Sequence, residues 1–271
     1  MKNKTPLLIP AVFLLALASA APARLSAGST LDLPGSRDPF SWLSSGLADI
    51  VYAAPAAEVF PVGVFDSPAD KIYYLSPNQV DISRVPPAPT AGSDVDKEDL
   101  AAVRRWQAER TEAQCEAARA QANATYDEFF GAVSPFGNPA PAEVEKIFSQ
   151  VRTDAGSMVF LLKNKYRRPR PFLRDPAIAP CLCRALGYAY PSGHSTAAHV
   201  FGLMLSDLVP ANAHKYMSYA NQGGLNRVIG GVHYPSDTEA GKTLGDAIYK
   251  ALKQNCVFNA DMDTLRKNLK R

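Results

Sequence analysis

The sequence has no marked excess of charge of either sign and, after its first residues, no long apolar run. Its 271 residues include 29 Lys and Arg against 26 Asp and Glu, a net charge of +3. Loss of a leader containing Lys2 and Lys4 would leave 27 against 26, or +1, so the charge does not indicate a nucleic-acid binder. No later segment stays uncharged for the roughly 20 residues that a membrane span needs. A composition of 46% hydrophobic and 20% charged residues also excludes a disordered or collagen-like chain.

The first residues have the order of a secretory signal peptide. Lys2 and Lys4 precede an apolar run of about 14 residues, and small residues follow at 18–23. A membrane anchor is the alternative, but the run is shorter than a span and is accompanied by Pro6 and Pro10. We therefore expect residues 1–23 to be removed and the protein to be periplasmic or secreted.

Cysteines are few, and export would permit them to form disulfides. Cys115, Cys181, Cys183 and Cys256 allow three pairings, among which the sequence does not choose. A bridge between Cys181 and Cys183 would be strained because one residue separates them, which favours links to Cys115 and Cys256. Free thiols are the alternative, and a zinc site is disfavoured because no histidine lies at finger spacing.

Strand patterns and internal repeats are also lacking. Residues 24–90 are rich in Pro and Ala and predict an irregular arm and connector, which Trp42, Phe60 and Phe65 could anchor to the core. Residues 91–271 show helical periodicity at 96–122, 144–162, 196–209 and 237–252. The sequence therefore predicts an all-α, single-domain helical bundle with an irregular N-terminal arm.

The first of three chemically distinctive blocks is basic and lies at residues 163–171. Lys163 and Arg170 are seven residues apart, almost two helical turns, so they point the same way while a helix persists. Pro169 and Pro171 would end that helix and let Arg170 project from an extended corner. The alternative is a solvated basic helix end that complements the helix dipole.

The second block is Pro191-Ser192-Gly193-His194, which directly precedes a helical pattern. A helix N-terminus offers free N–H groups to an anion, and Gly193 lets the backbone approach it closely. Ser192 can add a hydroxyl, and His194 is placed to give a proton to a leaving group. Simple capping of the helix by Ser192 is the alternative.

The third block, at residues 226–237, holds a histidine and an aspartate four residues apart. Asp237, in the first turn of a helix that opens near Pro235, could accept from one ring nitrogen of His233 and leave the other nitrogen as a nucleophile. Arg227 is a further anion ligand, and Gly230-Gly231 would let the chain turn between Arg227 and His233. A structural histidine beside a capped helix is the alternative.

Together the blocks supply three cations, a helix N-terminus, a histidine acid and a histidine–aspartate pair, which suits phosphoryl transfer without a metal ion. The pattern Lys-x6-Arg-Pro, Pro-Ser-Gly-His, Arg-x5-His-x3-Asp is that of the type 2 phosphatidic acid phosphatase superfamily. Within it, residues from Leu75 onward most resemble the soluble class A nonspecific acid phosphatases of bacteria. The chain departs from that class at Tyr188, Ala189, Tyr190, Ser195 and Asn226 but keeps every charged and catalytic position.

The resemblance implies that His233 attacks phosphorus to form a phosphohistidine and that Asp237 orients it. His194 would protonate the leaving group and then activate water, so activity should fall at high and at low pH. It implies no cofactor. The residues it implies for holding the phosphate are Lys163, Arg170, Ser192, Gly193 and Arg227.

We therefore expect an exported acid phosphatase that hydrolyses small phosphomonoesters with broad specificity and has no nucleic-acid partner. The alternatives are a vanadate-dependent haloperoxidase, a noncatalytic phosphate-binding module and, less in keeping with the lack of spans, a lipid phosphatase. Dimers are frequent in the family, so a homo-oligomer is compatible with the resemblance, although no heptad predicts one. His199 and His214 are expected to be structural.

Overall fold

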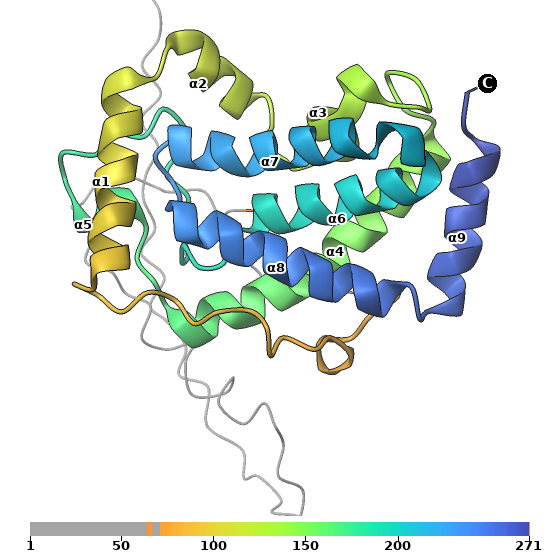
Figure 1. The fold of residues 1–271 in the computed structure, drawn as a ribbon, viewed down its shortest axis with the longest axis horizontal. Coiled ribbons are helices and arrows are strands. Elements are labelled where there is room, and N and C mark those ends of the chain that lie inside the picture. The colour runs from red at the N-terminus through yellow and green to blue at the C-terminus, as the bar shows by residue number, and fades with distance from the viewer. Residues whose placement is uncertain (1–63, 67–70, 271) are drawn as a thin grey trace, which may run out of the picture. The chain divides into compact units, whose positions relative to one another are not determined.

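The computed structural model describes residues 64–66 and 71–270, which form a set of packed helices (Figure 1). The expected leader and the anchors Trp42 and Phe60 lie outside these residues. Within them there is no β-strand, and the prediction of an all-α fold is confirmed. The described part also contains no helix long and apolar enough to cross a membrane. The helices are α1 (Asp94–Glu109), α2 (Glu112–Arg119), α3 (Tyr126–Phe130), α4 (Ala142–Tyr166), α5 (Pro171–Arg174), α6 (Gly193–Leu208), α7 (Ala213–Ile229), α8 (Pro235–Leu252) and α9 (Cys256–Lys267).

Helix α6 is the centre of the bundle and packs against α4, α7 and α8 (Figure 1). Most of its residues are buried, in keeping with a sequence that is apolar or small on every side. Small residues set the spacing to its neighbours. A Cβ atom at Gly224 of α7 would lie 3.0 Å from the Ser195 hydroxyl, and one at Gly241 of α8 would lie 2.7 Å from the Ser192 carbonyl oxygen. The helices therefore approach more closely than larger side chains would allow.

Two boundaries differ from the sequence-based expectation. The helical pattern at 96–122 is two helices, because Arg110 has an extended backbone and Thr111 caps α2 by accepting from the Gln114 N–H. Helix α4 ends at Tyr166, before the prolines, and Arg167 closes it in the left-handed conformation with φ 47°. Arg170 thus reaches the position beside Lys163 through a turn, and the two do not share one helix face.

This topology gathers several helix ends at one end of the bundle. The C-terminal ends of α4 and α7 lie near the N-terminal ends of α6 and α8 (Figure 1), and the Ser192 N–H donates to the Asp237 carbonyl at 3.0 Å. Helix α7 ends at Gly230, and Gly231, with φ 79°, reverses the chain toward His233 as the glycine pair predicts. The three sequence blocks therefore meet at the same end.

Candidate active site

Six of the eight predicted site residues line one cavity of about 390 Å³. Its walls also include Phe65 and Asp66 from the arm, and Leu182 and Cys183 from the segment after α5. A larger surface groove of about 720 Å³ between α1, α7 and α8 contains none of the predicted residues. The predicted residues in the cavity wall are Lys163, Arg170, Gly193, His194, Arg227 and His233.

His233 and Asp237 form the predicted pair. The His233 Nδ1 lies 3.2 Å from the Asp237 Oδ2, which also accepts from the Tyr234 N–H at 2.9 Å. The His233 Nε2 lies 3.3 Å from the Arg170 Nη1, which can only donate, so this nitrogen carries a lone pair and Nδ1 carries the proton. Burial and the charges of the nearby cations keep the pKa of His233 well below its usual range. The lowered pKa favours the neutral ring, with the lone pair on Nε2.

Behind this pair lies a buried charge network that the sequence analysis did not assign. The Arg168 Nη1 donates to the Asp237 Oδ1 at 2.7 Å, and its Nη2 donates to Asp99 at 2.8 Å and Asp96 at 3.1 Å. The guanidinium lies over the Tyr234 ring, 3.9 Å from its centre. Burial raises the pKa of Asp237 and the Arg168 charge opposes that rise. Arg168 thus favours the ionised carboxylate that His233 needs.

The cations of the first and third blocks line the same cavity as His233. Burial lowers the pKa of Lys163 to about 8 and, together with the Arg170 charge, that of Arg227 to about 9. Arg170 is fixed by bonds from Nε to the Gly187 carbonyl at 3.2 Å and from Nη1 to the Val232 carbonyl at 3.1 Å. Arg227 is only 9% exposed, and its Nε and Nη1 have no hydrogen-bond partner among the described residues. Buried guanidinium N–H groups that are charged and lack partners favour the binding of an anion.

His194 lies on the other wall of the cavity, in the first turn of α6. Its Nε2 lies 3.0 Å from the Gln121 carbonyl oxygen and 3.3 Å from that of Ala122, so Nε2 carries a proton and donates to them. Burial and the Arg227 charge hold the pKa of His194 well below its usual range. The anionic charge of a phosphate placed beside Arg227 would raise that pKa, because it favours the protonated ring.

Ser192 and Gly193 occupy different places. Gly193 is the first residue of α6 and lines the cavity, where its backbone faces the ring of Phe65. Ser192 is fully buried, caps α6 by accepting from the Ser195 N–H at 3.4 Å and is not among the cavity-lining residues. The structure therefore gives Ser192 a capping position. Its predicted contact with phosphate stays a prediction.

Two further histidines lie away from the cavity. His199 is buried in α6, and its Nε2 lies 2.8 Å from the Asp246 Oδ1 of α8. His214 is exposed near the start of α7. Neither lines the cavity, and their structural roles stay predictions. In the described ranges, no group of three or more His, Cys, Asp or Glu side chains is placed to hold a metal ion.

The arm contributes Asp66, which sequence reasoning missed. Its carboxylate lies 2.7 Å from the Lys163 Nζ and 3.0 Å from the Arg170 Nη2, and these cations hold its pKa below the usual value despite burial. No motif marks this aspartate, which is about a hundred residues from its partners in the sequence. Arg168, by contrast, lies inside the basic block, two residues before Arg170. Its place in that block could have marked it as a candidate site residue.

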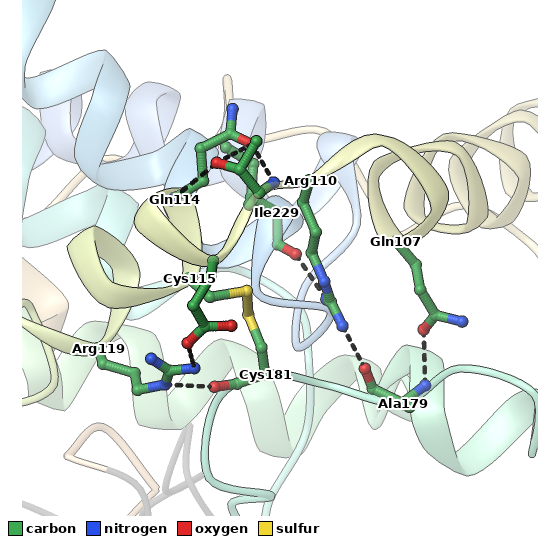
Figure 2. Close-up of a disulfide and its surroundings, with 10 residues drawn as sticks. Gln107, Arg110, Gln114, Cys115, Arg119, Ala179, Cys181 and Ile229 are labelled. Carbon is green, nitrogen blue, oxygen red and sulfur yellow. Dashed lines mark hydrogen bonds and ion pairs between the residues drawn. A yellow bond between two sulfur atoms is a disulfide. The ribbon is translucent and has the colours of Figure 1, made fainter.

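A disulfide holds the segment that forms one side of the cavity (Figure 2). Cys115 of α2 is bonded to Cys181, and Cys183 and Cys256 are both free and exposed. This is one of the two links that the spacing favoured, whereas Cys256 has no disulfide. Figure 2 also shows Arg110 donating to the carbonyls of Ala179 and Ile229, at 2.5 and 2.8 Å. The segment beside the cavity is thereby tied to α1, α2 and α7.

Comparison with known proteins agrees with the three blocks. Residues 150–257 match the model of the PAP2 superfamily. A non-specific acid phosphatase of Providencia stuartii is 29% identical over 205 residues, 70% of this chain and 82% of that protein. An acid phosphatase of Zymomonas mobilis is 32% identical over 113 residues, 40% of this chain and 43% of that protein, so this match spans less than half of the relative.

A structural likeness supports the fold. The crystal structure described as the first bacterial vanadium-dependent iodoperoxidase has a TM-score of 0.50 to this chain at 17% identity, covering 65% of this chain and 53% of that one. The resemblance inferred from the sequence blocks is confirmed, and a phosphatase is supported. Residues 150–257 of this chain therefore resemble the PAP2 superfamily, and the relatives support a phosphatase.

Proposed function

We propose that this protein is an exported acid phosphatase that hydrolyses phosphomonoesters of many kinds through a phosphohistidine at His233. One observation carries the proposal: His233 lines a cavity together with Lys163, Arg170 and Arg227, and its Nδ1 lies 3.2 Å from the Asp237 carboxylate. A nucleophile so placed needs an electrophile whose negative oxygens those cations can hold. A phosphate ester has both features.

In the first step, the His233 Nε2 forms a bond to phosphorus while the ester P–O bond breaks. The negative charge of the phosphoryl oxygens is held by Lys163, Arg170 and Arg227, and Asp237 stabilises the positive charge that develops on the ring. The departing oxygen takes a proton from His194. Because His194 Nε2 is committed to two backbone carbonyls, we assign the exchanged proton to its Nδ1.

In the second step, a water molecule gives a proton to His194 and attacks phosphorus, and the P–N bond breaks to release phosphate. The lowered pKa of His233 favours the unprotonated form of the nucleophile. The phosphate's own charge raises the pKa of His194 in the complex. These two effects support activity under acidic conditions.

Broad specificity has a physical basis in the cavity wall. We assign the three cations to the phosphoryl group. The remaining wall includes apolar or small residues together with two polar ones: Val64, Ala122, Leu182, Ala185, Arg119 and Asn123. Apolar groups discriminate weakly between leaving groups, since a misplaced methylene changes binding by only about 1–3 kcal/mol. Nucleoside, sugar and aryl monophosphates should therefore all be hydrolysed.

The test is phosphate release from a chromogenic aryl phosphate by the purified protein and by His233→Ala. We expect a loss of at least a thousandfold in His233→Ala and none in His199→Ala, which removes a buried histidine of α6 outside the cavity. A thousandfold loss is a lower bound, since removal of a nucleophile can cost about a millionfold in kcat. Equal activity of wild type and His233→Ala would exclude this mechanism.

Two further measurements complete the test. Vanadate should inhibit hydrolysis without halide oxidation in the presence of peroxide, whereas oxidation would favour a haloperoxidase. Export is checked by cell fractionation and by sequencing the N-terminus of the mature protein, which should lack residues 1–23. A retained leader would contradict the proposed localisation.

A further inference from the structure

An acidic side chain of the protein itself lies in the anion site. The Asp66 carboxylate is 3% exposed and pairs with the Lys163 Nζ at 2.7 Å and the Arg170 Nη2 at 3.0 Å. These are the two cations of the first sequence block. A carboxylate, like a phosphoryl group, offers oxygens to both of them at once. Asp66 therefore makes the contacts that the proposed mechanism gives to the substrate.

The preceding residue covers the helix N-terminus in the same cavity. The Phe65 side chain is buried against Gly193, so closely that a Cβ atom at Gly193 would lie 2.3 Å from the Phe65 ring. The ring also packs edge-on against His194, with 5.5 Å between the ring centres. Phe65 and Asp66 thus occupy both halves of the cradle, the helix end and the cation pair.

Asp66 pairs with two of the three cations that the proposed mechanism assigns to the phosphate. Arg227 makes no ion pair with Asp66 among the contacts of the described residues, and its Nε and Nη1 remain without partners there. A phosphoryl group has three oxygens and more negative charge than a carboxylate, so it can engage all three cations. The internal carboxylate is therefore the weaker of the two ligands for this site.

We propose that Asp66 is an internal competitor of the substrate phosphate, and that Asp66 and Phe65 must leave the cradle before a phosphomonoester can bind. The inference rests on the proposed function, since it takes Lys163 and Arg170 as phosphate ligands. A site that is open for only a fraction of the time binds its ligand with an affinity reduced by that fraction. Removing the internal competitor should therefore lower KM.

The test uses the full chain with Asp66→Asn, which keeps the size of the side chain and removes its charge. We expect KM for an aryl phosphate and the inhibition constant of inorganic phosphate to fall together by about tenfold, which corresponds to a closed form favoured by about 1.4 kcal/mol. Phe65→Ala should lower both constants in the same direction. Asp81→Asn removes the charge of an exposed aspartate in the same arm and should change neither constant.

Values within twofold of wild type for both Asp66→Asn and Phe65→Ala would overturn the proposal. A higher KM in Asp66→Asn would also overturn it, because Asp66 would then assist substrate binding. Circular dichroism and thermal unfolding verify that each variant is folded.

Binding of inorganic phosphate, measured by calorimetry on wild type and Asp66→Asn, separates this inference from the proposed function. Tighter binding in Asp66→Asn without His233-dependent turnover in either protein would support the competitor and refute the phosphatase mechanism. His233-dependent turnover with identical phosphate binding in the two proteins would support the phosphatase mechanism and refute the competitor.

Discussion

Replacing Arg168 by Met should affect catalysis through Asp237, which Arg168 contacts from the side away from the cavity. The change removes a guanidinium that bonds the buried Asp237 at 2.7 Å and Asp99 at 2.8 Å, and the partly buried Ser236 at 2.7 Å. Asp96 keeps Arg174 as a partner, at 2.6 and 2.8 Å, but Asp237 loses its contact with a cation. Breaking a buried ion pair on one side destabilises a fold by about 3–5 kcal/mol.

The effect of Arg168→Met on catalysis is more specific than its effect on stability. Burial already raises the pKa of Asp237, and without the opposing charge of Arg168 that pKa rises further. The rise favours the protonated carboxyl group, which no longer accepts from the His233 Nδ1 as an anion. We expect kcat to fall by about 100-fold to 10,000-fold, the range over which loss of an orienting carboxylate acts in comparable sites.

The pH profile distinguishes this role from a merely structural one. An ionised Asp237 is the active form, so the remaining activity of Arg168→Met should increase as pH rises through the new pKa. Arg168→Lys, which keeps a charge, should retain more activity. The control is Arg174→Met, which removes a partner of Asp96 and has no contact with Asp237, and it should keep the wild-type profile. A folded Arg168→Met protein with unchanged kcat and pH dependence would refute the reasoning.

The remaining predictions concern the cations, the disulfide and the helix contacts. As pH rises through about 8, kcat/KM should fall because Lys163 loses its proton, and in Lys163→Arg, assayed in parallel, the fall should move to higher pH. Cys115→Ala opens a bridge between residues 66 apart and should lower the free energy of unfolding in guanidinium by about 2–4 kcal/mol, whereas Cys256→Ala should not change it. Gly241→Ala places a methyl group 2.7 Å from the Ser192 carbonyl oxygen and should lower the free energy of unfolding by about 1–3 kcal/mol, measured by thermal unfolding. An unchanged melting temperature would contradict a close contact between Gly241 and Ser192.

The parts of the fold predicted correctly are those whose information is local. Helices α6 and α8 have clear periodicity and N-terminal signals, and both begin within three residues of the expected positions. The break between α1 and α2 was also readable, since Thr111 and Gln114 form a capping box.

Helix α7 was missed for a physical reason. It contains Gly223 and Gly224, which disfavour a helix when judged by propensity alone. In the folded chain these residues let α7 approach Phe129, Ala198 and Ser195, with distances of 3.0 to 3.2 Å from an added Cβ. Packing against α6 therefore overrides the local preference, and a sequence pattern does not contain that information.

The same distinction applies to the cavity. Three motifs named six of the residues that line it, because their chemistry and spacing are local. Arg168 and Asp66 act through partners at long range: Arg168 is 69 residues from Asp237, and Asp66 is 104 residues from Arg170. Only the packing of the chain brings such groups together.

The Arg227 Nε and Nη1, which have no hydrogen-bond partner among the described residues, have a consequence for the stability of the fold. Burying a cation without hydrogen-bond partners is unfavourable, and Lys163 and Arg170 lie in the same cavity. An anion that binds there relieves this penalty only in the folded chain, since the unfolded chain has no cradle. Folding and anion binding are thus thermodynamically linked, and at a hundred times its dissociation constant phosphate would add about 2.7 kcal/mol to the free energy of unfolding. We therefore expect the melting temperature of this protein to rise with the concentration of phosphate in solution.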